Sequence, residues 1–166
     1  MVTGLPGTGK STFAAHLSEA ISAQHLNTDI IRDAMGKRGS YDANTKATVY
    51  DEMLRQAAQL LQAGQSIIID GTFYQKKLRQ PYLELSHKLN IPIYWLEVKA
   101  AEEVVRTRVS HRRMYSEADF EVYLKIKSQY EQLDAPHLEL WSDQYSNMNE
   151  MIEKTKKYLS SSTTML

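Results

Sequence analysis

The chain has 166 residues, with 20 basic and 20 acidic side chains that cancel, a pI of about 7.0 and no cysteine. This length fits a single domain over residues 1–166, and the balanced charge gives no support to a broad nucleic-acid-binding surface. Disulfides, zinc–thiolate sites and thiol nucleophiles are excluded, and no apolar run is long enough to span a membrane, so we expect a cytoplasmic protein.

The first recognisable element is a phosphate-binding loop. Residues 4–11 read Gly-Leu-Pro-Gly-Thr-Gly-Lys-Ser and match the pattern G-x-x-x-x-G-K-[ST]. The alternative is a glycine-rich turn that binds nothing. Residues 1–3 are the only part of a preceding strand in the sequence, which leaves open whether that strand is short or begins further upstream. Residues 11–22 have apolar side chains at helical spacing and predict the first helix.

The loop supplies the predicted binding residues for a nucleoside triphosphate, which we take to be ATP, and for Mg²⁺. Lys10 is expected to reach the β- and γ-phosphates, and the Ser11 hydroxyl is expected to bind Mg²⁺. The helix that starts near Lys10 adds the positive end of its dipole. The predicted nucleotide-binding residues are Gly4, Pro6, Gly7, Thr8, Gly9, Lys10, Ser11, Thr12 and, from a later helix, Arg108.

The rest of the chain alternates between extended and helical segments. This alternation is typical of an α/β domain in which helices cover a parallel sheet. Further strands are predicted at 24–28, 66–70, 91–98 and 138–141. Helices are predicted at 32–35, 42–64, 78–89, 100–113, 116–130 and 148–159, with Asp42 as a helix cap and a frayed tail at about 160–166.

A carboxylate follows the most apolar predicted strand. Ligands of open parallel sheets bind beyond the carboxyl ends of the strands, and Asp70 ends the run Ser-Ile-Ile-Ile-Asp. This is the form of a Walker B element, which helps to hold Mg²⁺. The alternative role for Asp70 is to cap the following turn. Gly71 occupies the position where motor ATPases commonly carry a glutamate, which disfavours water as the phosphoryl acceptor.

A second carboxylate follows the 24–28 strand. Asp29 and Arg32 are three residues apart and would face the same cleft. Asp29 could accept a proton from an acceptor hydroxyl, while Arg32 could bind an anionic group of the acceptor. The alternative is a helix cap, at Asp29 or Asp33, and a solvated arginine. The Lys37-Arg38 loop favours an anionic acceptor.

Four arginines lie within residues 106–113, at the end of a predicted helix. Arginines from a closing lid can stabilise the charge that develops during phosphoryl transfer, and residues 106–118 are the predicted lid. The alternative is that these cations only complement the dipole at the end of the helix.

Taken together, these motifs resemble the P-loop kinases of the polynucleotide 5′-hydroxyl kinase type, an AAA-type P-loop kinase domain. The resemblance covers about residues 1–145 and rests on the phosphate loop, Asp29-x-x-Arg32, Ile-Ile-Ile-Asp70-Gly-Thr and the arginine-rich segment before Ser-Glu-Ala-Asp. Zeta toxins, chloramphenicol phosphotransferase and gluconate kinase are more distant relatives. The resemblance implies a five-stranded parallel sheet of order 2-3-1-4-5. It also implies transfer of phosphate from ATP to a hydroxyl of a small molecule or of a nucleic-acid 5′ end.

The resemblance also implies a role for each matching residue. Lys10 and Ser11 would hold the phosphates and Mg²⁺, and Asp70 would organise that site. Asp29 would be the general base and Arg32 would bind an acceptor phosphate, while Arg113 or Arg108 would contact the transferred phosphate. A nucleotide-binding regulatory module with little turnover is the second hypothesis, because such a module needs no carboxylate facing an acceptor. An ATPase is the third.

Overall fold

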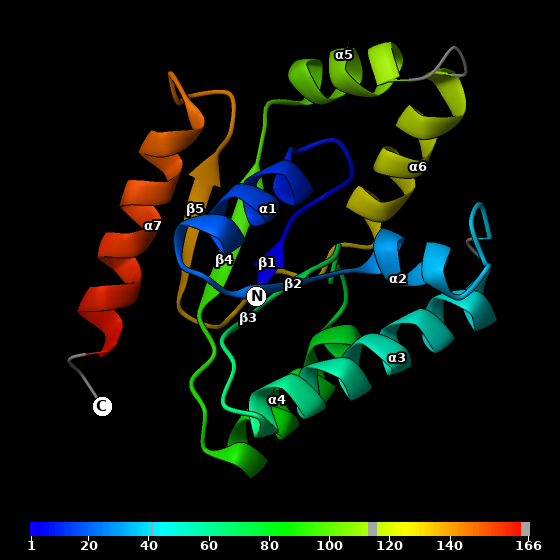
Figure 1. Ribbon diagram of the computed structural model, residues 1–166. Coiled ribbons are helices and arrows are strands. Elements are labelled where there is room, and N and C mark those ends of the chain that lie inside the picture. Colours follow the sequence, from blue (N-terminus) through cyan, green and yellow to red (C-terminus); the bar gives the residue numbers. More distant parts are fainter. Residues whose placement is uncertain (41, 113–115, 164–166) are drawn as a thin grey trace.

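The computed structural model describes residues 1–40, 42–112 and 116–163. Its five strands form one parallel sheet in the order β2-β3-β1-β4-β5, as the resemblance to P-loop kinases implies (Figure 1). The strands are β1 (Val2–Thr3), β2 (Gln24–Asn27), β3 (Ile67–Asp70), β4 (Trp95–Lys99) and β5 (His137–Trp141).

Helices connect the strands. They are α1 (Lys10–Ala20), α2 (Thr28–Ala34), α3 (Ala43–Gln62), α4 (Lys76–Leu89), α5 (Glu102–Arg112), α6 (Ser116–Ser128) and α7 (Met148–Thr163). The predicted cap of α3 is confirmed, because Asp42 Oδ1 accepts a hydrogen bond of 2.9 Å from the Thr45 N–H. None of the described helices combines the length and the apolar character needed to cross a membrane.

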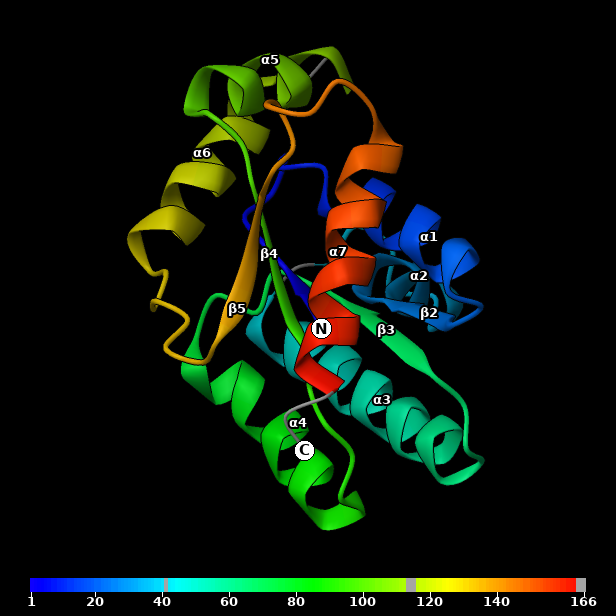
Figure 2. The same cartoon turned by 90° about the vertical axis from the view of Figure 1, so that its left-hand side faces the viewer.

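Helices cover both faces of the sheet (Figures 1 and 2), and an apolar core lies between the sheet and the helices on each face. On one face, α1 and α7 pack on β1, β4 and β5 through side chains such as Phe13, Leu140 and Met151. On the other face, α3 and α4 pack on β2 and β3 through side chains such as Met53, Ile69 and Tyr82. The sheet is therefore the middle of three layers, and its inner strands β3, β1 and β4 are mostly buried.

Three boundaries differ from the prediction by more than two residues. Helix α2 begins at Thr28, directly after β2, because Asn27 caps it there, whereas the sequence predicts a helical turn only at 32–35. The fourth strand begins at Trp95, although the apolar run from residue 91 predicts an earlier start. Pro92 has no N–H to donate to a neighbouring strand. The adjacent strand β1 begins only at Val2, which pairs with Leu96. Residues 91–94 therefore lack the neighbouring strand that would make them part of the sheet. Helix α7 continues to Thr163, into the segment that the sequence predicts to be a frayed tail.

Candidate active site

The phosphate loop runs from the end of β1 to the start of α1. Gly9 has φ +88° and occupies the N-cap position of α1, where no side chain makes a capping hydrogen bond. The Thr8 hydroxyl donates to the Leu5 carbonyl at 2.9 Å and closes the turn. Backbone N–H groups at a helix start without a side-chain cap form an anion-binding site, so this loop has the geometry for a phosphate.

The backbone of β4 fixes the loop at its first glycine. Gly4 has φ +152°, and a Cβ atom there would lie 2.3 Å from the Val98 carbonyl oxygen. Gly64 has φ +74°, but no atom lies within 4 Å of the position its Cβ would take. The two glycines therefore share a positive φ but differ in the space around them.

We expect Gly4→Ala to destabilise the fold by at least about 3 kcal/mol, because it combines backbone strain with a clash against backbone. Gly64→Ala is the matched control and should cost only about 1–2 kcal/mol, since it adds strain alone. Urea unfolding of both variants measures the difference. Equal losses in the free energy of unfolding would show that the close approach to the Val98 carbonyl does not add to the cost of the substitution.

An arginine of α5 and a distant serine converge on the same loop. Arg108 Nη1, from α5, donates to the Thr8 carbonyl at 3.2 Å and to Ser142 Oγ at 2.8 Å. Ser142 Oγ, which follows β5, donates to the same Thr8 carbonyl at 2.7 Å. Arg108 thus lies against the loop where the sequence predicts a nucleotide-binding arginine. Ser142 is a contact that the sequence did not suggest.

Helices α5 and α6 pack on the loop through apolar side chains. Val105 of α5 and two aromatic side chains of α6, Phe120 and Tyr123, form a small core that also includes Leu5 of the loop. The Arg106 guanidinium lies 3.9 Å from the centre of the Phe120 ring, so its observed contact is with this core. Arg113, the other predicted lid contact, lies outside the described residues.

Asp70 is the most enclosed charged group of the site. It ends β3, is fully buried, and its Oδ2 lies 3.3 Å from His25 Nε2 and accepts a hydrogen bond from the Asn27 amide. Burial acts to raise the pKa of this carboxyl. The hydrogen bond with His25, the charge of Lys10 and the polar groups of Ser11 and Asn27 outweigh burial and hold the pKa below its usual value.

One oxygen of Asp70 is suited to a cation. Asp70 Oδ1 is buried and has no hydrogen-bond partner among the residues that the structure describes. A buried acceptor without a partner is unusual in a protein and calls for a ligand, an ion or a water molecule. Mg²⁺ prefers oxygen ligands, and the Ser11 hydroxyl is joined to Asp70 through the same Asn27 amide. These residues therefore fit Mg²⁺.

The lowered pKa of Asp70 gives a pH-dependent stability. Its carboxyl in the unfolded chain binds a proton near pH 4, whereas the folded protein resists protonation to lower pH. The stabilisation is therefore complete above about pH 4 and is lost as the pH falls below it. We expect the stability difference between the wild-type chain and Asp70→Asn to shrink in that range. Urea unfolding at several pH values measures it, with the exposed Asp51→Asn as the control.

Asn27 links the phosphate loop to α2. Its Nδ2 donates to Ser11 Oγ at 3.3 Å and to Asp70, while its Oδ1 accepts from the N–H groups of Asp29 at 2.8 Å and Ile30 at 3.1 Å. Asn27 is thus the N-cap of α2. The alternative role of Asp29 as the cap of this helix is therefore wrong.

Asp29 and Arg32 form an ion pair in which the two partners differ in exposure. Arg32 Nη1 lies 2.5 Å from Asp29 Oδ1, and the side chain of Asp29 is 72% exposed while that of Arg32 is 6% exposed. Arg32 is therefore not the solvated arginine of the alternative interpretation. The pair presents a carboxylate that a substrate can reach, held in place by a buried cation.

The strand order brings these groups together. β2, β3 and β1 are neighbours in the sheet, and their carboxyl ends lead to Asp29, to Asp70 and to the phosphate loop, respectively. The sequence had no signal for His25 as a contact of Asp70. For Asn27 a signal existed, because asparagine immediately before a helix is a preferred cap.

Comparison with known proteins shows the family of the chain. Residues 1–133 match the AAA_33 family model, described as an AAA domain. An uncharacterised protein of Mycobacterium tuberculosis is 34% identical over 125 residues, which are 68% of this chain and 25% of that protein. The chain thus spans a quarter of the length of this relative. An adenylate kinase of Pseudothermotoga lettingae is 30% identical over 131 residues, 69% of this chain and 58% of that protein.

The fold also has a counterpart among solved structures. The APS kinase of Mycobacterium tuberculosis, solved in complex with AMPPNP and APS, matches with a TM-score of 0.78. The sequence identity is 17%, and the match covers 96% of this chain and 95% of the other. The likeness shows that the chain has a kinase-like P-loop fold.

Proposed function

Because this chain belongs to the AAA domain family that its residues 1–133 match, we propose that it is an ATP-dependent kinase acting on a hydroxyl group. The observation that carries the proposal is the Asn27 linkage. Through it, a phosphate loop, a buried carboxylate suited to Mg²⁺ and an accessible carboxylate on α2 lie along one edge of the sheet. A domain that only bound nucleotide would not need the last of these groups.

In the proposed reaction, the acceptor oxygen bonds to the γ-phosphorus of ATP as the bond to the β-phosphate oxygen breaks, and ADP leaves. The hydroxyl proton passes to the Asp29 carboxylate. Arg32 keeps that carboxylate in place through their ion pair. Lys10 and the loop N–H groups bind the phosphates, and Arg108 approaches them from α5. Ser11 and Asp70 would hold Mg²⁺, which neutralises phosphate charge when bound.

We propose that the acceptor is a small anionic molecule. A second cation, Lys46 of α3, lies near the same edge, with its Nζ 3.2 Å from the Tyr74 hydroxyl. Together with Arg32 and the Lys37-Arg38 loop it gives this side of the site a positive character. The likeness to a kinase solved with APS supports a small molecule. Because the motifs resemble those of polynucleotide 5′-hydroxyl kinases, the 5′-hydroxyl end of a nucleic acid is the alternative acceptor.

The test is a transfer assay with γ-labelled ATP and Mg²⁺ against a panel of small hydroxyl compounds, anionic and neutral, and a 5′-hydroxyl oligonucleotide. We expect label to appear on a small anionic acceptor. Release of labelled phosphate with every acceptor would identify an ATPase instead. Tight binding of ATP without transfer or hydrolysis would identify a nucleotide-binding regulatory module.

A further inference from the structure

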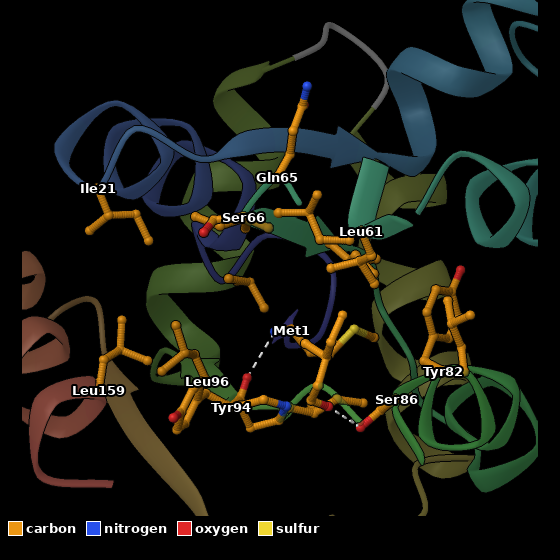
Figure 3. Close-up of a pocket in the computed structure, with 18 of the residues that line it drawn as sticks. Met1, Ile21, Leu61, Gln65, Ser66, Tyr82, Ser86, Tyr94, Leu96 and Leu159 are labelled. Carbon is orange, nitrogen blue, oxygen red and sulfur yellow. Dashed lines mark hydrogen bonds between the residues drawn. The ribbon is translucent and has the colours of Figure 1, made fainter. Parts of the chain in front are cut away.

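Two cavities border β4, and they differ in the side chains that line them. The first, of about 460 Å³, surrounds Met1, and Figure 3 shows Leu61 and Tyr82 on one side of it. None of the described residues that line this first cavity has a charged side chain. The second, of about 600 Å³, is lined by residues of β4, β5 and α6, which include glutamates, lysines, a histidine and aromatic side chains. The second cavity is therefore the one that offers charged groups to a ligand.

Alternate residues of β4 and β5 line this polar cavity. Leu96 and Val98 of β4, like Leu138 and Leu140 of β5, pack in the core under α1 and α7. The residues between and beside them point to the opposite face and line the cavity: Glu97, Lys99, His137, Glu139 and Trp141. Figure 2 shows α6 and α7 on opposite sides of these two strands, so the cavity lies on the side of α6.

Three of these side chains bring possible metal ligands together. Glu97 and Glu139 are register partners in neighbouring strands, and His137 precedes Glu139 by two residues on the same face. His137 Nε2 lies 3.6 Å from Glu97 Oε2 and 3.6 Å from Glu139 Oε1. One ligand atom from each of the three residues lies within 4.8 Å of the other two. Ligand atoms around a tetrahedral Zn²⁺ are about 3.4 Å apart, so only a small contraction would enclose an ion.

The histidine and one glutamate are oriented for this role by groups outside the cluster. His137 Nδ1 lies 2.8 Å from the Ala135 carbonyl oxygen, which can only accept a hydrogen bond, so Nδ1 carries the proton of a neutral ring. The lone pair of Nε2 then faces two carboxylate oxygens, at distances too long for hydrogen bonds. A metal-binding histidine typically donates its other N–H to a carbonyl in this way. The Tyr130 hydroxyl likewise donates to Glu97 Oε1 and leaves Oε2 toward the histidine.

A cation of the chain itself already lies between the two carboxylates. Lys99 Nζ is 3.0 Å from Glu97 Oε2 and forms an ion pair with Glu139 Oε1. Carboxylates directly opposite each other on neighbouring strands repel, and Glu97 is buried, so this pair requires a positive charge. The Lys99 side chain is 31% exposed and has a flexible stem, so its ammonium group can move into solvent when another cation arrives.

We propose that Glu97, His137 and Glu139 form a metal site which binds a divalent transition-metal ion such as Zn²⁺ in place of the Lys99 ammonium. One imidazole nitrogen and two carboxylate oxygens suit Zn²⁺, whereas Mg²⁺ and Ca²⁺ prefer oxygen ligands alone. A water molecule from the cavity would complete a tetrahedral set. In the sheet, β1 lies between this site and Asp70, so it is separate from the groups that fit Mg²⁺ beside the phosphate loop. The ion would tie β4 to β5.

The test titrates Zn²⁺ into the full chain by calorimetry at about pH 8, where an ordinary imidazole is neutral, with excess Mg²⁺ to occupy the groups around Asp70. We expect one Zn²⁺ to bind per chain and the melting temperature to rise with Zn²⁺ concentration. His137→Ala should weaken binding by at least about 100-fold, and Tyr130→Phe, which removes only the bond that orients Glu97, by about 10-fold. His87→Ala, at an exposed position of α4, is the matched control and should bind as the wild-type chain does.

Lys99→Met should change the affinity in the opposite direction. It removes the competing ammonium group and keeps an unbranched side chain, so Zn²⁺ should bind at least about 10-fold more tightly than to the wild-type chain. Damage to the fold cannot mimic this gain. Lys88→Met, at an exposed position of α4, is its matched control and should leave the affinity unchanged. Unchanged affinity in either His137→Ala or Lys99→Met, or no binding of Zn²⁺ to either the wild-type chain or Lys99→Met, would overturn the proposal.

Discussion

Replacing Lys10 with alanine is expected to abolish phosphoryl transfer and to weaken the binding of ATP·Mg²⁺ severely. The side chain follows Gly9 at the first position of α1, where it adds a full charge to the backbone N–H groups of the loop. Loss of one preorganised donor to a developing charge typically lowers turnover by about 10²–10³-fold. Lys10 also contributes to the lowered pKa of Asp70, so its removal weakens a second part of the site.

Isothermal titration with ATP·Mg²⁺ and a turnover assay measure the two effects. Lys88→Ala is a suitable control, because it removes an exposed lysine from the last turn of α4, away from the loop. The control should retain wild-type affinity and rate. If Lys10→Ala did the same, the loop would not be a triphosphate site.

Asp29→Asn is expected to lower the rate of transfer by about 10²–10⁴-fold, the usual contribution of general-base catalysis. The substitution keeps the size and hydrogen-bonding shape of the side chain but removes the charge that accepts a proton. Asp29 is exposed and Asn27 caps the helix, so folding should be almost unaffected. ATP affinity should change little, because the contacts to the loop run through Asn27.

Asp33→Asn is the matched control, since it removes the same charge from an exposed position on the same short helix. It should leave kcat and KM unchanged. Arg32→Ala tests the other half of the ion pair and should lower kcat, because Asp29 loses its buried partner, and raise KM for an anionic acceptor. A variant Asp29→Asn that turns over normally but binds ATP poorly would refute the acceptor-site model.

The main elements could be predicted because they depend on local signals, whereas the sheet order was an expectation from the resemblance to P-loop kinases. The apolar run 67–70, the glycine pattern at 4–9 and the cap at Asp42 each act within a few residues. The start of β4 could not be predicted in this way. It depends on the length of β1, which pairs with it from more than ninety positions away in sequence, as the bond from Met1 to Tyr94 shows.

The same distinction between local signals and long-range contacts applies to the candidate site. The sequence indicates which carboxylates and cations lie at the strand ends, because strand ends are visible in the hydrophobic pattern. It does not indicate that Asn27 reaches both Ser11 and Asp70, or that Ser142 contacts Thr8 across 134 positions. Those contacts depend on the packing of β2 beside β3 and of β5 beside β4, which only the folded sheet provides.

The two hydrogen bonds that the Thr8 carbonyl accepts would affect how the domain responds to ligands. Three remote stretches of chain meet at this single oxygen: the loop itself, α5 through Arg108, and the turn after β5 through Ser142. A nucleotide that rotates the Thr8 peptide must break both bonds, and whatever shifts α5 must alter the shape offered to the nucleotide. Thermodynamic linkage makes these two influences equal in size. An effector that binds α5 or the turn after β5 would therefore tune nucleotide affinity without touching a phosphate.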